Sequence, residues 1–170
     1  MKNVITYRTD RIEELKKLAK ENGVSLSSLT STIIHDYLEH YIITRNFKMF
    51  CSGEKALSVA FESLDKQTLE KVIKIASKEA TNSMKTMTDE FSFENISSIM
   101  RKWFDYNKFE LKEFYEKDTI KWVCKTNLSK NFNEYISKVT VNIINQFGYD
   151  GISSNEDDII QIKISKQKRY

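Results

Sequence analysis

The feature that most constrains this chain is a short strand-like segment near its amino terminus. Residues 3–8 read Asn-Val-Ile-Thr-Tyr-Arg, rich in β-branched and aromatic types, and their alternation sets Ile5 and Tyr7 opposite Thr6 and Arg8. A strand that covers apolar side chains must pair its backbone N–H and C=O groups. No other segment in the first 50 residues has strand character. The economical partner is the same strand of a second copy, so we expect a homodimer with an antiparallel intersubunit ribbon.

Two amphipathic helices separated by a glycine turn are predicted after this strand. Asp10 and Glu13 form a helix-start pattern, and helical apolar spacing continues from Ile12 to Gly23. Gly23 is placed where a left-handed residue ends a helix, and Ser25 can cap the next helix. That second helix is expected from about Leu26 into the forties. Its apolar residues recur every three or four positions: Leu26, Leu29, Ile33, Tyr37 and Tyr41.

The order strand, helix, tight turn and helix over residues 1–45 resembles the ribbon-helix-helix family of DNA-binding proteins. The resemblance is carried by Ile5–Arg8, Leu15–Leu29 and Asp36–Leu38. It implies that a two-stranded ribbon enters the major groove of DNA and that backbone N–H groups at the start of the second helix bind phosphates. It covers about a quarter of the chain, and no family resemblance covers the remainder.

Carried over by position, the resemblance implies a set of DNA-contacting residues. Thr6 and Arg8 would face base edges, where an arginine can donate two parallel hydrogen bonds to guanine. The full implied set is Lys2, Val4, Thr6, Arg8, Ser25 and Ser27. A one-residue change of strand register would exchange the two faces, and Val4 on the outward face with Asn3 on the inward face leaves that alternative open.

The rest of the chain is predicted to be helical, followed by a compact α-β-β-α-β domain. With no proline and only four glycines, long helices should dominate. Residues 46–90 predict a helical connector, in which Gly53 precedes one helix and Asp65 caps the next. These helices could equally pack on the partner subunit or within their own. The expected fold class is therefore α+β, mainly helical, with domains at 1–45, 46–90 and 91–170.

Within residues 91–170, a helix is expected to begin at Ser92 and a β-hairpin to turn near Lys117-Asp118. Leu128 to Phe147 predict a second helix that ends at Gly148. A loop should follow, and then a final strand over Ile160–Ile164 that joins the hairpin. The last five residues, 166–170, are basic and are expected to form a mobile tail that is mainly solvated.

Composition limits the classes of protein to which the chain can belong. Its 170 residues are 40% hydrophobic and 30% charged, which is typical of globular proteins, and no apolar run approaches a membrane span. We therefore expect a folded cytoplasmic protein without membrane contact. Cys51 and Cys124 are isolated and are expected to be buried small hydrophobic residues. The net charge of +3 permits nucleic-acid binding without demanding it.

Catalytic and metal-binding patterns are weak in this sequence. His35 and His40 are five residues apart on a predicted helix, a poor spacing for one face. No glycine-rich phosphate loop, nucleophile elbow or zinc-protease motif occurs. We therefore expect no catalytic residues, no metal and no cofactor.

Taken together, the sequence predicts a homodimeric transcriptional regulator, a repressor by the resemblance, that binds double-stranded DNA. Its carboxy-terminal domain would sense a small-molecule effector, bind a protein partner or extend the oligomer. One alternative is an antitoxin that uses the same DNA-binding end and neutralises a toxin with its second domain. Another is a helical interaction module that never binds DNA, and a further one is a single larger domain in which residues 1–45 form a capping strand and helical hairpin.

Overall fold

A computed structural model of the chain describes residues 9–46, 53–88 and 90–168. Its contacts divide the chain into two units, Met1–Tyr41 and Ile42–Tyr170. The described residues form six helices and one four-stranded antiparallel sheet, so the expected α+β, mainly helical class is confirmed. None of the helices in these ranges is long and apolar enough to cross a membrane.

The amino-terminal unit contains α1 (Ile12–Glu21) and the first part of α2 (Leu26–Asn46), as the apolar spacing predicts. The start of α1 differs from the prediction by one residue. Arg11, not Asp10, is the N-cap residue, and no side chain caps the helix. The backbone N–H of Arg11 instead donates a hydrogen bond to the Thr9 hydroxyl (3.0 Å), so the predicted capping role of Asp10 is wrong.

In the carboxy-terminal unit, side-chain caps set the starts of several helices, whereas the helix that follows Gly53 has none. Asp65 accepts a hydrogen bond from the backbone N–H of Thr68 (2.7 Å), and Ser92 accepts one from Asn95 (3.3 Å). Both caps were predicted, because Ser and Asp oxygens satisfy N–H groups that have no carbonyl partner in the first turn. The helices are α3 (Glu54–Glu62), α4 (Lys66–Met87), α5 (Phe93–Tyr106) and α6 (Lys130–Gln146).

The sheet joins two hairpins through their second strands. Its strands are β1 (Glu110–Tyr115), β2 (Thr119–Lys125), β3 (Tyr149–Glu156) and β4 (Ile159–Lys168), in the order β1-β2-β4-β3. The predicted hairpin and the predicted junction of the last strand with it are confirmed. On the inner face, Trp122 lies opposite Ile162 and Ile120 lies opposite Ile164, and none of the four is more than 3% exposed.

The strand β3 was not expected, and the prediction of a loop after Gly148 is wrong. Residues 149–156 lack the apolar alternation typical of a half-buried strand, because β3 is an edge strand whose second half is exposed. A Cβ atom at Gly151 would lie 3.3 Å from Ile144 Cγ2, so β3 approaches α6 closely there. The carboxy-terminal domain is therefore α-β-β-α-β-β.

The basic residues at the carboxy terminus are also more ordered than predicted. The strand β4 continues to Lys168, so residues 166–168 belong to the sheet and not to a mobile tail. The backbone N–H of Lys166 donates to the carbonyl of Asp118 (2.9 Å), and its ammonium group donates to the carbonyl of Glu116 (3.0 Å). The β1–β2 turn thus fixes the position of this end of β4.

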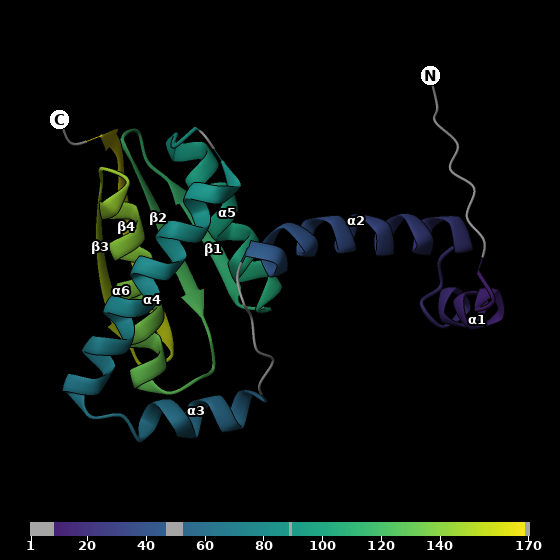
Figure 1. Cartoon of the computed structure of the whole chain (residues 1–170), viewed down its shortest axis with the longest axis horizontal. Helices are drawn as coiled ribbons and strands as arrows, with labels where there is room; N and C mark the ends of the chain where they lie inside the picture. Colours follow the sequence, from purple (N-terminus) through teal and green to yellow (C-terminus); the bar gives the residue numbers. More distant parts are fainter. Residues whose placement is uncertain (1–8, 47–52, 89, 169–170) are drawn as a thin grey trace. The chain divides into compact units, whose positions relative to one another are not determined.

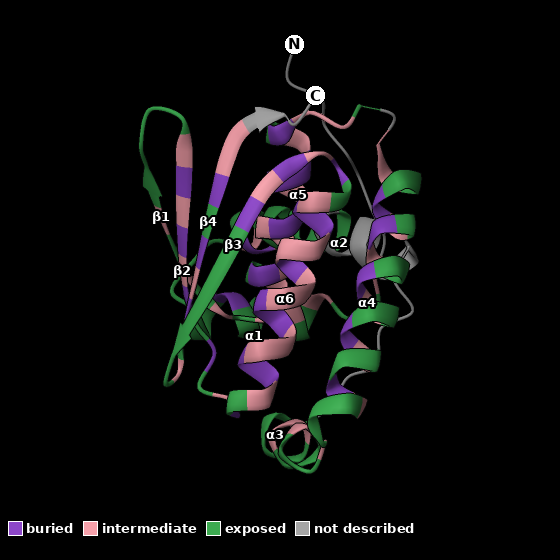
Figure 2. Cartoon of the chain, turned by 90° about the vertical axis from the view of Figure 1, so that its left-hand side faces the viewer, coloured by how far each residue is buried: buried purple, intermediate pink, exposed green. Residues whose placement is uncertain are grey.

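The helices cover one face of the sheet in two layers. In Figures 1 and 2, α5 and α6 lie against the sheet and α4 packs on the side of α6 that faces away from it. Leu69, Ile73 and Met84 of α4 are each at most 4% exposed. Asn131 of α6 donates hydrogen bonds to the carbonyls of Phe61 (2.9 Å) and Leu64 (3.0 Å) at the end of α3. Residues 54–87 are thus packed within the carboxy-terminal unit and do not form a separate connector.

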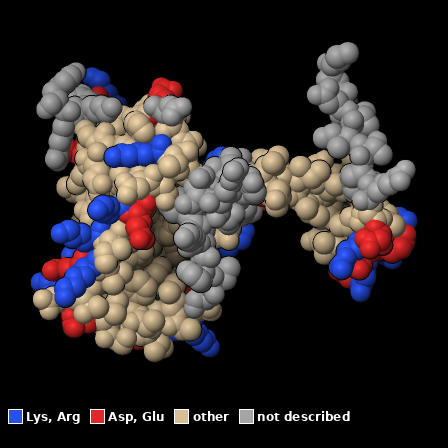
Figure 3. Space-filling model, in the orientation of Figure 1, with Lys and Arg blue, Asp and Glu red and all other residues tan. Residues whose placement is uncertain are grey.

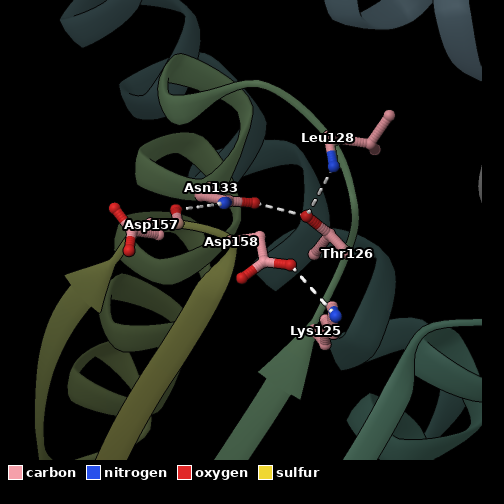
Figure 4. A network of polar contacts seen from close by, with 6 residues as sticks. All are labelled: Lys125, Thr126, Leu128, Asn133, Asp157 and Asp158. Atoms are coloured by element: carbon pink, nitrogen blue, oxygen red, sulfur yellow. Dashed lines mark hydrogen bonds and ion pairs between the residues drawn. The ribbon is translucent and has the colours of Figure 1, made fainter.

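A buried asparagine holds two turns at one end of the sheet together (Figure 4). Asn133 is fully buried, and its amide nitrogen donates to the carbonyl of Asp157 in the β3–β4 turn (3.1 Å). Its carbonyl oxygen accepts a hydrogen bond from the Thr126 hydroxyl. That hydroxyl in turn accepts the backbone N–H of Leu128 (3.2 Å). Because a buried amide is costly unless paired, Asn133 fixes the loop before α6 to this turn.

Two isoleucines on neighbouring strands test the assignment of the buried face. Ile162 is 1% exposed, whereas Ile152 on the outer face is 68% exposed. We expect Ile162→Ala to lower the free energy of unfolding by about 2–5 kcal/mol, because it leaves a cavity in a packed core. Ile152→Ala should change it by no more than about 0.5 kcal/mol. Equal effects in urea denaturation would show that the two faces are assigned wrongly.

Candidate nucleic-acid interface

The turn between α1 and α2 is fixed by its backbone hydrogen bonds. Gly23 adopts φ +66°, a left-handed conformation that is strained for residues with a Cβ. The N–H of Val24 donates to the carbonyl of Ala19 (3.0 Å), and the N–H of Gly23 donates to that of Lys20 (3.1 Å). This pair of bonds is a Schellman motif. The predicted role of Gly23 is confirmed.

Ser25 starts the second helix, as predicted. Its hydroxyl accepts the backbone N–H of Ser28 (3.1 Å), and its carbonyl accepts that of Leu29 (2.9 Å). Ser27 lies in the same first turn, and both serines are exposed. The structure therefore brings the two predicted phosphate-contacting serines together at the start of α2.

The electrostatic setting of this helix start differs from that of α1. The first turn of α1 contains Glu13 and Glu14, which compensate the positive end of its dipole, whereas the first turn of α2 contains no acidic residue. No carboxylate of that turn therefore competes with an anion for the positive end of the α2 dipole. Such a helix start favours an anion such as a phosphate.

Several basic residues in and beside α1 form ion pairs with acidic neighbours. Ion pairs join Arg11 to Glu14 (3.3 Å) and Lys16 to Glu13 (2.7 Å), and Figure 3 shows the two charge types side by side over α1. These pairs are largely exposed, so each contributes little to stability. Because its charges are locally balanced, α1 is a weak candidate for phosphate contacts.

The second helix presents a broad apolar face. Ile33, Ile34, Tyr37 and Leu38 are 42% to 62% exposed, and among the described residues of this unit only Ala19 and Leu29 are buried hydrophobics. Most of the visible surface of α2 in Figure 3 carries no acidic or basic side chain. Sequence reasoning included Ile33 and Tyr37 in the apolar stripe but missed Ile34 and Leu38, whose four-residue spacing places them one beside the other on the helix.

The remaining predicted contact residues lie outside the described residues. These are Lys2, Val4, Thr6 and Arg8, together with the whole of the predicted strand over residues 3–8. The ribbon and its base-reading role therefore stay predictions from the sequence.

Cys124, one of the two cysteines of this chain, lies in the core of the carboxy-terminal unit. Cys124 is 1% exposed, and burial raises the pKa of its thiol to about 12, so the thiol stays protonated at neutral pH. Its expected role as a buried small residue is confirmed, whereas Cys51 lies outside the described residues. In the ranges that the structure describes, no group of three or more histidine, cysteine or acidic residues could hold a metal ion.

No protein-family model matches the chain, and no curated protein matches it.

The two serines at the start of α2 provide a matched test of its cap. Ser25→Ala should destabilise the first turn of α2 by about 1 kcal/mol, because the N–H of Ser28 loses its acceptor. Ser27→Ala removes an equal hydroxyl that caps nothing, so the turn should keep its stability. Amide hydrogen exchange at Ser28 and Leu29, followed by NMR, measures both effects. Equal protection in the two variants would contradict the assigned cap.

Proposed function

We propose that this chain is a homodimeric, sequence-specific DNA-binding transcriptional regulator that acts in the cytoplasm. The observation that carries the proposal is the α1–Gly23–Ser25–α2 unit, whose capped helix start is free of acidic residues and whose apolar face is exposed. The carboxy-terminal unit would serve effector sensing or further oligomerisation.

The exposed face of α2 supports the dimer. Among the described residues of this unit of about 40 residues, two hydrophobic side chains are buried, and units as small as this commonly depend on association for stability. A second copy presents the same face, so a two-fold axis allows Ile33, Ile34, Tyr37 and Leu38 to bury one another. Full burial of a large apolar side chain contributes roughly 1.5–3 kcal/mol, which makes this face the main source of dimer stability.

The start of α2 and the preceding segment support DNA as the partner. In a two-fold dimer, the predicted strands over residues 3–8 of both copies would pair and present Thr6 and Arg8 to base edges, with Lys2 and Val4 beside them. Ser25 and Ser27 would place the amide groups of α2 against the phosphates on either side. Base reading and backbone anchoring would thus come from adjacent parts of one unit.

Charged substitutions on opposite sides of α2 test the dimer. Ile34→Lys should raise the dissociation constant of the dimer at least tenfold, or about 1.4 kcal/mol, because it puts a charge in the buried interface. Thr32 is exposed and lies about half a helical turn from the apolar face, so Thr32→Lys should leave the constant unchanged. Sedimentation velocity over a dilution series measures both. A dimer that is indifferent to Ile34→Lys would rule out this interface.

Two arginines near the amino terminus test the DNA-binding role. With a duplex selected from genomic fragments, Arg8→Ala should lower discrimination against a scrambled duplex by about 1–3 kcal/mol, because a bidentate base contact is lost. Arg11 is paired with Glu14 on α1, so Arg11→Ala should leave discrimination intact. Fluorescence anisotropy at several salt concentrations measures affinity and salt slope. If no duplex binds in a salt-dependent way, the chain is an interaction module and the regulator proposal fails.

A further inference from the structure

A cavity of about 190 Å³ lies between α4, α5 and α6 in the carboxy-terminal unit. It exists because α4 turns two small side chains, Ala76 and Ala80, toward the other two helices. These alanines are one helical turn apart on the same face as the buried residues Ile73 and Met84. Larger residues at these two positions would fill the space, so the opening follows from the sequence of α4.

The walls of the cavity are apolar and adaptable. Met84 of α4 and Met100 of α5 are nearly buried, and methionine side chains adjust readily to the shape of a bound group. Trp103 of α5 and Tyr135 of α6 add two aromatic rings that are partly exposed. A site with this lining favours a flat apolar group over a polar one.

One carboxylate stands among these apolar walls. Glu79 lies on α4 between the two alanines, lines the cavity and is exposed, which places its charge at the mouth. Burial raises the pKa of the Tyr135 phenol, and the negative charge of Glu79 raises it further, so the two groups are within electrostatic range of each other. A cation at the mouth would be attracted both by this carboxylate and by the aromatic faces.

We propose that this cavity is a binding site for a small arylalkylamine, a molecule with one aromatic ring and an ammonium group on a short aliphatic arm. The ring would occupy the space beside Ala76 and Ala80, and the ammonium group would lie at the mouth near Glu79. An engineered apolar cavity of about 150 Å³ accommodates benzene, so this volume suits one ring with a short aliphatic arm. Such a ligand would be the effector of the regulatory role proposed above. Binding of the amine to the cavity can be measured whether or not the chain binds DNA.

Three probes of nearly equal size separate shape from charge. Benzylamine, benzyl alcohol and benzoate share one ring but carry a positive, a neutral and a negative group. On the full-length chain, benzylamine should bind roughly tenfold more tightly than benzoate, with benzyl alcohol between them, because of the charge of Glu79.

Calorimetry gives the affinities of the three probes. Fluorescence gives a local signal, since Trp103 lines the cavity and the other tryptophan, Trp122, is fully buried elsewhere. Failure of all three probes to bind at millimolar concentration, or equal binding of benzoate and benzylamine, would overturn the proposal.

Matched variants test the site itself. Ala80→Leu fills the cavity and should abolish binding of all three probes, whereas Ala56→Leu on the exposed side of α3 should not affect it. If Ala80→Leu fails to fold by circular dichroism, Ala76→Leu makes the same test from the neighbouring turn. Unchanged binding in a folded, filled variant would show that the probes bind elsewhere and would refute the site.

The charge preference has its own variant and control. Glu79→Gln should bring the affinities of benzylamine and benzoate together while leaving that of benzyl alcohol within about twofold, because only the charge at the mouth is removed. Glu70 is an exposed glutamate farther toward the start of α4 and does not line the cavity. Glu70→Gln should therefore preserve the preference. A preference that survives Glu79→Gln would contradict the assigned role of this carboxylate.

Discussion

The packing of α5 and α6 on the inner face of the sheet is the interaction on which the carboxy-terminal unit depends. Trp122, Ile160 and Ile162 of this face and Ile144 of α6 are all at most 1% exposed. Once α6 is held there, its other side is available to α4. The amide group of Asn142 donates to the Ser77 hydroxyl of α4 (3.1 Å), so a polar contact sets the position of the outer layer. The cavity between the helices follows from this order of layers.

The two units reach stability by different means. The carboxy-terminal unit has a large continuous core. It includes buried residues of the strands β2 and β4 and of the helices α4, α5 and α6. The amino-terminal unit has a Schellman turn at Gly23 and a cap at Ser25, but among its described residues only Ala19 and Leu29 are buried hydrophobics. Local hydrogen bonds define the shape of short helices without making them stable, because helix stability in proteins comes mainly from tertiary packing. The proposed association would supply apolar contacts that the described residues of this unit do not make among themselves.

The proposed DNA and ligand sites use charge in opposite ways. The start of α2 owes its suitability for phosphate to the absence of carboxylates in its first turn. The cavity owes its proposed preference for a cation to a single carboxylate, Glu79, beside apolar and aromatic walls. In both places a small local difference in charge, and not the modest net charge of the chain, distinguishes the surface. This is why composition alone could permit DNA binding but could not indicate where either ligand would lie.

The sequence by itself determined the helices, most of their ends and the first hairpin, whereas the start of α1 at Arg11 was not predicted. Caps and turns at Gly23, Ser25, Asp65 and Ser92 depend on side chains within a few residues, so they can be read along the chain. The tertiary structure alone decided that residues 149–156 form an edge strand, that the order is β1-β2-β4-β3, and that α4 packs on α6. It also decided that the small side chains of Ala76 and Ala80 face a cavity between the helices. These features depend on which distant surfaces meet, and an exposed edge strand or an alanine carries no periodic signal that records its partner.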